Sequence, residues 1–198
     1  MKHEIYWGMI ERKNRPNVLL SYLSEHSVEQ ENKNQLIRDI WVDTEFPEVN
    51  KSVWDRLLKM YKPVTKNTAG ELKIYRGHTP INSRAWSWTT DKDKAIWFAK
   101  RNYEFMCIAF EETQGMKCHM PSYVMSGIIK KKHILFEYNG RKESEVVIAG
   151  WRKNIWAEQP TIIQEVRECL NQEEKQKIIK QNKRIMAENK RIMEGSII

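Results

Sequence analysis

The chain has 198 residues, of which 40% are hydrophobic and 10% aromatic, and its formal net charge is +8. This composition indicates one globular domain, with or without an appendage, and excludes a disordered chain. No apolar run approaches the ~18 residues of a membrane helix, and the first residues do not form a signal peptide. We therefore expect a cytoplasmic protein without a membrane partner. The positive charge favours polyanionic partners, such as nucleic acid, nucleotide phosphates or an acidic protein.

The three cysteines, Cys107, Cys118 and Cys169, are odd in number and far apart. They predict reduced thiols and no disulfide framework. The pair Cys118-His119 has no further ligands at the spacing of a zinc site, so we expect no metal.

The N-terminal third of the chain predicts three helices. Val18–Leu23 forms a short apolar stretch, and the apolar residues of Leu36–Trp41 recur at helical spacing. Pro47 interrupts this pattern. Ser52 can cap a third helix, which Pro63 ends.

From Leu72 onward the pattern changes to short strands. Asp91 can cap one helix among them, with Ala95, Phe98 and Ala99 on one face. Asn139-Gly140 is typical of a tight hairpin turn. The strands are predicted at residues 72–75, 85–90, 105–110, 123–129, 134–138 and 145–148.

Helices first and strands afterwards indicate an α+β fold with a mostly antiparallel sheet. We divide the chain into a helical region (1–64) that belongs to the same domain as the following β core (65–160), and a basic helical tail (161–198). In this tail, Asn182–Met186 recurs one heptad later as Asn189–Met193. Three interpretations stay open: a helix docked on its own domain, a helix for a neutralising partner protein, or a basic arm on nucleic acid.

Several common catalytic motifs are absent from the sequence. No glycine-rich G-x-G-x-x-G or Walker loop occurs, which argues against a Rossmann or P-loop nucleotide site. Neither G-x-S-x-G nor H-E-x-x-H is present, so the usual hydrolase signatures are missing as well.

Two carboxylates, Glu143 and Glu145, stand one residue apart at the start of an apolar β-branched run. Side chains alternate along a strand, so both are predicted to project from the same side. Alone, this pattern is typical of a solvated edge strand. In a cleft, however, paired acids are candidates for catalysis.

Three short segments follow one another in a fixed order: Tyr75-Arg76-Gly77, Ser87-Trp88-Thr89 and Glu143-Ser144-Glu145. Together they resemble the Arg–Ser–Glu class of mono-ADP-ribosyltransferases, over about residues 72–150. The resemblance implies an ADP-ribosyltransferase-like fold, in which N-terminal helices precede a split β-sheet core. It also implies NAD as substrate and a toxin or effector of bacterial or phage type.

The resemblance also assigns roles. Glu145 would stabilise the oxocarbenium-like state of NAD cleavage and bind the ribose 2′-hydroxyl, while Glu143 would orient or deprotonate the acceptor. Arg76 would clamp the dinucleotide. Gly77 would let backbone groups approach the nicotinamide amide. Ser87 would orient Glu145 through a hydrogen bond.

Some positions depart from the family pattern. Thr89 replaces a Ser and would support the Ser87 segment, and Trp88 replaces a small Thr, where it can stack on a ring or fill the core. Gly140 stands where the family carries an aromatic residue, with Tyr138 nearby. The acceptor therefore stays open between a protein side chain and RNA.

Two other functions remain open from the residues alone. A basic protein rich in Trp can bind nucleic acid without catalysis, through base stacking and phosphate contacts. Alternatively, a degenerate transferase fold can serve as a binding module. Neither alternative would release nicotinamide from NAD.

Overall fold

The computed structural model describes residues 7–44, 47–63, 69–80, 86–115, 120–139, 144–148, 155–173 and 176. Its helices are α1 (Arg15–Glu25), α2 (Gln30–Asp43), α3 (Lys51–Met60) and α4 (Lys92–Gln114), with short 3-10 turns η1 (Trp7–Met9), η2 (Arg12–Asn14), η3 (Pro47–Asn50) and η5 (Lys131–His133). Its strands are β1 (Glu71–His78), β2 (Ser87–Thr89), β3 (Ser122–Lys130), β4 (Ile134–Tyr138), β5 (Glu145–Ile148) and β6 (Trp156–Val166). The described part of the chain is thus a mixed helix and sheet structure of the α+β class.

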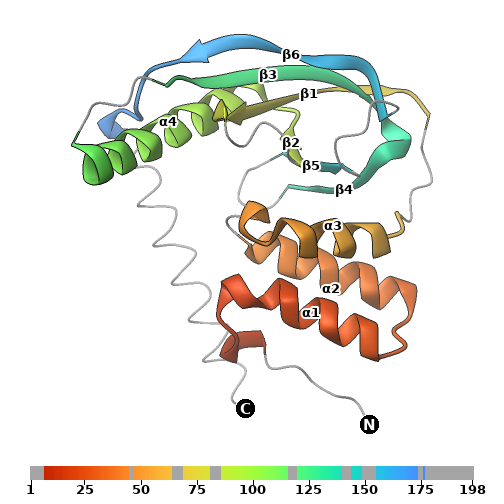
Figure 1. Ribbon diagram of the computed structural model, residues 1–198. Helices are drawn as coiled ribbons and strands as arrows, with labels where there is room; N and C mark the ends of the chain where they lie inside the picture. The colour runs from red at the N-terminus through yellow and green to blue at the C-terminus, as the bar shows by residue number, and fades with distance from the viewer. Residues whose placement is uncertain are drawn as a thin grey trace.

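The strands form one sheet in the order β4-β5-β2-β1-β3-β6, and every neighbouring pair is antiparallel. The long strands β1, β3 and β6 lie over α4, whereas β2, β5 and β4 curve towards the layer of α1, α2 and α3 (Figure 1). Both groups of helices therefore cover the same face of the sheet, α4 at β1 and the N-terminal helices at β5 and β4.

The three N-terminal helices and the nearer strands share one apolar core, which we call the helical core. Its aromatic centre is Trp41, which makes edge-to-face contacts with Trp54, Trp86 and Phe136 at centroid distances of 4.8, 6.2 and 6.2 Å. Val147 of β5 is fully buried in the same cluster. The predicted helical region is thus packed on the sheet.

Helix α4 packs directly on the backbone of β1 at Gly77, which has no side chain. Asp91 caps the helix by accepting hydrogen bonds from the backbone N–H groups of Asp93 and Lys94, as the sequence predicts. Ala95 and Ala99 are fully buried against β1, also as predicted, and face Gly77. Gly115, in the left-handed conformation at φ 62°, ends the helix.

Several predicted elements differ from the structure. Residues 105–110 are helical, because α4 continues unbroken from its Asp91 cap to Gly115. Ser52 lies inside α3, whose N-cap position is Asn50. Residues 161–166 belong to strand β6, so the prediction of helix for them is wrong. The repeat at 182–193 lies outside the described residues.

Two further differences concern the strands around the candidate site. Arg76 lies within β1, which runs on to His78, and does not end the strand. Tyr138 pairs with Glu145 across β4 and β5, so six residues connect these strands. The predicted hairpin between these strands is present, but its connection is longer than the tight turn expected at Asn139-Gly140, and Gly140 lies outside the described residues.

Among the described residues, no helix combines the length and apolar character needed to cross a bilayer.

Candidate functional site

Three adjacent central strands carry Arg76, Ser87 and Glu145; Ser87 and Glu145 share one face of the sheet, whereas Arg76 lies on the face of Trp88. The register places Tyr75 opposite Thr89 across β1 and β2, and Thr89 opposite Glu145 across β2 and β5. Segments that are far apart in the sequence therefore meet within two strand spacings, about 5 Å each.

Hydrogen bonds connect the three residues in series. Arg76 Nη1 donates to the backbone carbonyl of Ser87 at 2.6 Å, and Ser87 Oγ donates to Glu145 Oε1 at 2.5 Å. The second bond is short, as is typical of a hydroxyl that donates to a carboxylate. The orientation of Glu145 by Ser87, which the resemblance implies, is present in the structure.

Trp41 of α2 is a second donor to the same carboxylate. Its Nε1–H lies 3.1 Å from Glu145 Oε1, and its ring is buried in the helical core. Sequence reasoning assigned Trp41 only to the apolar face of a helix. No local pattern links two residues 104 positions apart, so this contact had no signal in the sequence.

The two donors fix the orientation of the Glu145 carboxylate. Both bind Oε1, and no described residue donates to Oε2. Glu145 is half-buried, whereas Val147, on the same face of β5, is completely buried. The carboxylate thus lies at the border of the helical core with one oxygen left to accept a hydrogen bond from a hydroxyl group.

Trp88 and Thr89 both stabilise the fold: Trp88 fills a core, and Thr89 supports a turn. Trp88 is 2% exposed and packs edge-to-face on Trp156 at 5.1 Å in the core on the opposite face of the sheet. Of the two predicted alternatives, core filling applies, and stacking on a cofactor ring does not. Thr89 Oγ1 accepts from the backbone N–H of Asp91 at 3.1 Å and supports the turn into α4.

The close packing of α4 on β1 requires a glycine at position 77. A Cβ atom there would lie 2.2 Å from Ala95 O and 2.4 Å from Ala99 N, which no real contact permits. Its carbonyl accepts a hydrogen bond from Asn102 Nδ2 at 3.3 Å. The glycine is required by the close approach of α4, so the predicted role in admitting nicotinamide has no support here.

Glu143 lies outside the described residues, so its relation to Glu145 stays a prediction. The neighbouring Ser144 is described, and its carbonyl accepts from the backbone N–H of Thr90 at 3.2 Å. Ser144 therefore lies beside the turn between β2 and α4.

His78, two residues after Arg76 on the same face of β1, was missed by sequence reasoning. Its Nδ1 lies 2.7 Å from the Thr79 carbonyl, which assigns the proton to Nδ1. Its Nε2 is buried and has no hydrogen-bond partner among the residues that the structure describes. Burial and the positive charge of Arg76 lower the pKa of His78, in part offset by the Thr79 hydrogen bond. A neutral imidazole therefore follows Arg76.

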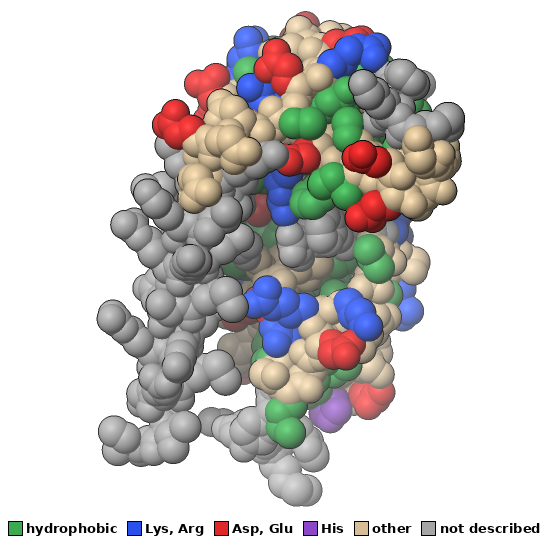
Figure 2. Space-filling model, turned by 90° about the vertical axis from the view of Figure 1, so that its left-hand side faces the viewer, with side chains coloured by type: hydrophobic (Ala, Val, Ile, Leu, Met, Phe, Trp, Pro, Cys, Tyr) green, Lys and Arg blue, Asp and Glu red, His purple; other side chains and the backbone are tan. Residues whose placement is uncertain are grey.

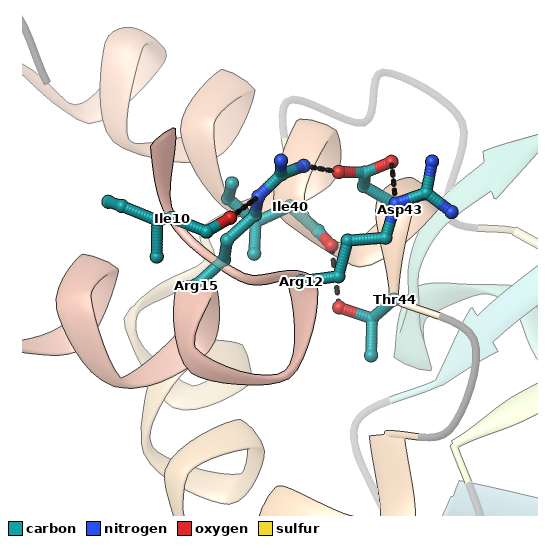
Figure 3. Close-up of polar contacts among 6 residues, drawn as sticks. All are labelled: Ile10, Arg12, Arg15, Ile40, Asp43 and Thr44. Carbon is teal, nitrogen blue, oxygen red and sulfur yellow. Dashed lines mark hydrogen bonds and ion pairs between the residues drawn. The ribbon is translucent and has the colours of Figure 1, made fainter. Parts of the chain in front are cut away.

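A surface hollow of about 320 Å³ lies on the other side of Trp41, between the N-terminal turns and α2. Its wall includes Tyr138, the register partner of Glu145. Asp43 receives ion pairs from both Arg12 and Arg15, and Arg15 Nε donates to the Ile10 carbonyl at 3.0 Å (Figure 3). These contacts hold the N-terminal turns against the end of α2.

Among the described residues, no group of three His, Cys, Asp or Glu side chains could hold a metal ion. Comparison with known proteins gave no match to a family model, to a curated protein or to a solved structure.

Proposed function

We propose that this protein is an NAD-dependent mono-ADP-ribosyltransferase with an ADP-ribosyltransferase-like fold, acting on a protein or an RNA. The observation that supports this function most strongly is the series of hydrogen bonds from Arg76 to Ser87 and from Ser87 to Glu145. Its three members come from three separate motifs, in the order that the resemblance requires. They occupy neighbouring strands in the middle of an antiparallel sheet.

The oriented Glu145 carboxylate suits the chemistry of NAD cleavage. The bond between ribose C1′ and the nicotinamide nitrogen breaks, and nicotinamide leaves with the electron pair. Positive charge then develops on C1′ and the ring oxygen, where a fixed carboxylate stabilises it. The acceptor's nucleophilic atom forms a new bond to C1′ and loses its proton.

The orientation of Glu145 matters because it is fixed before the substrate binds. Ser87 and Trp41 hold Oε1, so Oε2 would accept the hydrogen bond from the ribose 2′-hydroxyl without reorganisation. Arg76 would bind the diphosphate, for which a planar guanidinium is suited. Glu143 would accept the acceptor's proton.

The test is NAD turnover by the protein and its Glu145→Gln variant. Glutamine keeps the shape of the side chain but removes the negative charge, so nicotinamide release should fall at least about 100-fold. Glu137→Gln is the matched control, since Glu137 is exposed on the adjacent strand β4 and pairs with Val146. Its turnover should equal that of the unaltered protein.

Incubation with NAD labelled in the adenosine part and a cell lysate identifies the acceptor class. Label that appears in the protein or the RNA fraction only when Glu145 is intact supports the transferase. If folded protein releases no nicotinamide and transfers no label, the enzymatic proposal is overturned, and a binding module remains.

A further inference from the structure

Cations and aromatic rings alternate along one flank of α4, and we call this row the α4 ladder. Lys94 Nζ lies 4.6 Å from the ring centre of Trp97, and the guanidinium of Arg101 lies 5.7 Å from Trp97 and 5.2 Å from Phe105. The side chain of Phe105 is 49% exposed, and that of Ile108, about one turn later, is 45% exposed. Phe105 and Ile108 are neighbours on one flank of the helix, and contiguous exposed apolar side chains mark contact surfaces where single ones do not.

Helix α4 lies on the face of the sheet that carries Glu145, because Gly77, which packs against Ala95 and Ala99, shares that face. Ala95 and Ala99 point to β1, and Lys100 pairs at 3.2 Å with Glu168, just after the edge strand β6. Residues at intervals of three and four from Lys94 lie on the opposite flank of the helix from Lys100 and are turned away from β1. Seen from the end towards which α4 runs, exposed hydrophobic side chains lie in the upper part of the molecule, among acidic and basic ones (Figure 2).

The α4 ladder also begins close to the candidate site. Thr89 of β2 is the register partner of Glu145, and α4 starts three residues later, at Lys92. Lys94 is therefore within the first turn. From Lys94 to Phe105 the helix rises about 16 Å, which matches the length of a few stacked nucleotides.

The charges on α4 favour a polyanion on this flank and not elsewhere on the helix. Between Lys94 and Ile108 the flank carries two cations and no carboxylate. Asp93, Glu104 and Glu111 lie together on the neighbouring face, at helical spacing, and Glu112, one turn after Ile108, ends the ladder's own flank with a negative charge. A nucleic acid strand would thus be confined to the α4 ladder and to the end nearer Glu145.

We propose that the α4 ladder binds single-stranded RNA and presents it to Glu145 as the acceptor of ADP-ribose. Lys94 and Arg101 would contact phosphates, while Trp97 and Phe105 would stack on bases. A duplex, whose bases are already stacked, would bind less tightly. The acceptor role rests on the proposed transferase function, whereas RNA binding is tested separately from catalysis.

The test measures binding of a fluorescent single-stranded RNA of about 12 nucleotides to the full chain. The Glu145→Gln protein serves as the background, so no turnover is needed. Arg101→Gln with Phe105→Ser removes one phosphate contact and one stacking ring. We expect binding at least about 5-fold weaker, and a logarithmic salt dependence shallower by about 0.7.

Arg167→Gln with Ile163→Ser is the matched control, because it removes the same charge and an equally exposed apolar side chain on and after β6. This control should bind RNA as the background protein does. If Arg101→Gln with Phe105→Ser does not fold, Lys94→Gln with Ile108→Ser tests the same flank. Equal weakening by the control, equal affinity for duplex RNA, or no RNA binding would overturn the inference. Label transferred only to protein would overturn the acceptor role.

Discussion

Trp41 and Ser87 both donate to Oε1 of Glu145, but they have different structural roles. Ser87 lies on the neighbouring strand, whereas Trp41 belongs to α2 and reaches the carboxylate from the helical core. The N-terminal helices therefore take part in the candidate site through one indole N–H. This contact makes Trp41 a positioning residue, distinct from the groups that would touch NAD.

Replacing Trp41 with Phe should lower nicotinamide release about 10-fold, while the aromatic packing of the helical core is largely kept. A hydrogen bond to a charged group contributes about 1.5–3 kcal/mol, and Ser87 still holds the same oxygen, so the lower end of that range applies. The measurement is kcat for NAD hydrolysis, together with the unfolding midpoint of each variant.

Trp54→Phe is the matched control, because Trp54 is fully buried in the same core and its Nε1 has no hydrogen-bond partner. Both variants lose similar volume and should lose similar stability. Equal kcat values in the two variants would show that Trp41 acts only through packing.

At the scale of single residues, the sequence predicted the local parts of the site. Short motifs predict Arg76, Ser87 and Glu145, and hydrogen bonds through Ser87 connect them, with Arg76 on the face of the sheet opposite to Glu145. Trp88 and Gly77 were assigned to NAD on the same basis, yet they pack against Trp156 and α4. Neighbouring residues in a motif share a strand but face opposite sides of it, and the tertiary partner of each side is not encoded locally.

At the scale of elements, the contact between α4 and β1 depends on Gly77. Gly77→Ala would force a Cβ into the backbone of Ala95 and Ala99, and backbone atoms cannot move aside as a flexible side chain can. We expect destabilisation of about 3 kcal/mol or more, measured by denaturant unfolding. Gly8→Ala, where no atom lies within 4 Å, should change stability by less than about 0.5 kcal/mol.

The Gly77 experiment also separates two explanations for this glycine. If Gly77→Ala unfolds at the same denaturant concentration as the unaltered protein but no longer binds NAD, the close approach of nicotinamide explains the residue. If stability falls as expected, helix packing explains it.

The elements that sequence reasoning missed share a physical cause. Residues 105–110 form an apolar, aromatic-rich run, and such short runs do not distinguish strand from helix. The capped start at Asp91 and the late stop at Gly115 decide in favour of helix. β6 is an edge strand with mostly exposed residues and Pro160 in its middle, so it lacks the alternating pattern of a buried strand.

At the scale of the whole molecule, the helical core belongs to the N-terminal helices and to the sheet at the same time. Trp86, Leu135, Phe136 and Val147 from the β core are buried in it. Polar contacts cross the same boundary, since Trp86 Nε1 donates to Asp55 of α3 at 3.2 Å and Arg38 lies over the Phe136 ring at 5.7 Å. The predicted boundary at residue 64 is therefore a boundary of secondary structure within one folding unit.

A chain that starts at residue 65 should accordingly fail to fold. Without α1, α2 and α3, the side chains of Trp86, Phe136 and Val147 would form an exposed apolar patch, and Glu145 would lose the Trp41 donor. We expect no cooperative unfolding transition and no near-ultraviolet circular dichroism from this fragment. Adding residues 1–64 as a separate chain should restore both signals, because the core needs the helices but not the peptide bond. If the fragment alone unfolds cooperatively as a monomer, the helices are an addition to an independent β domain, and their role at Glu145 is regulatory.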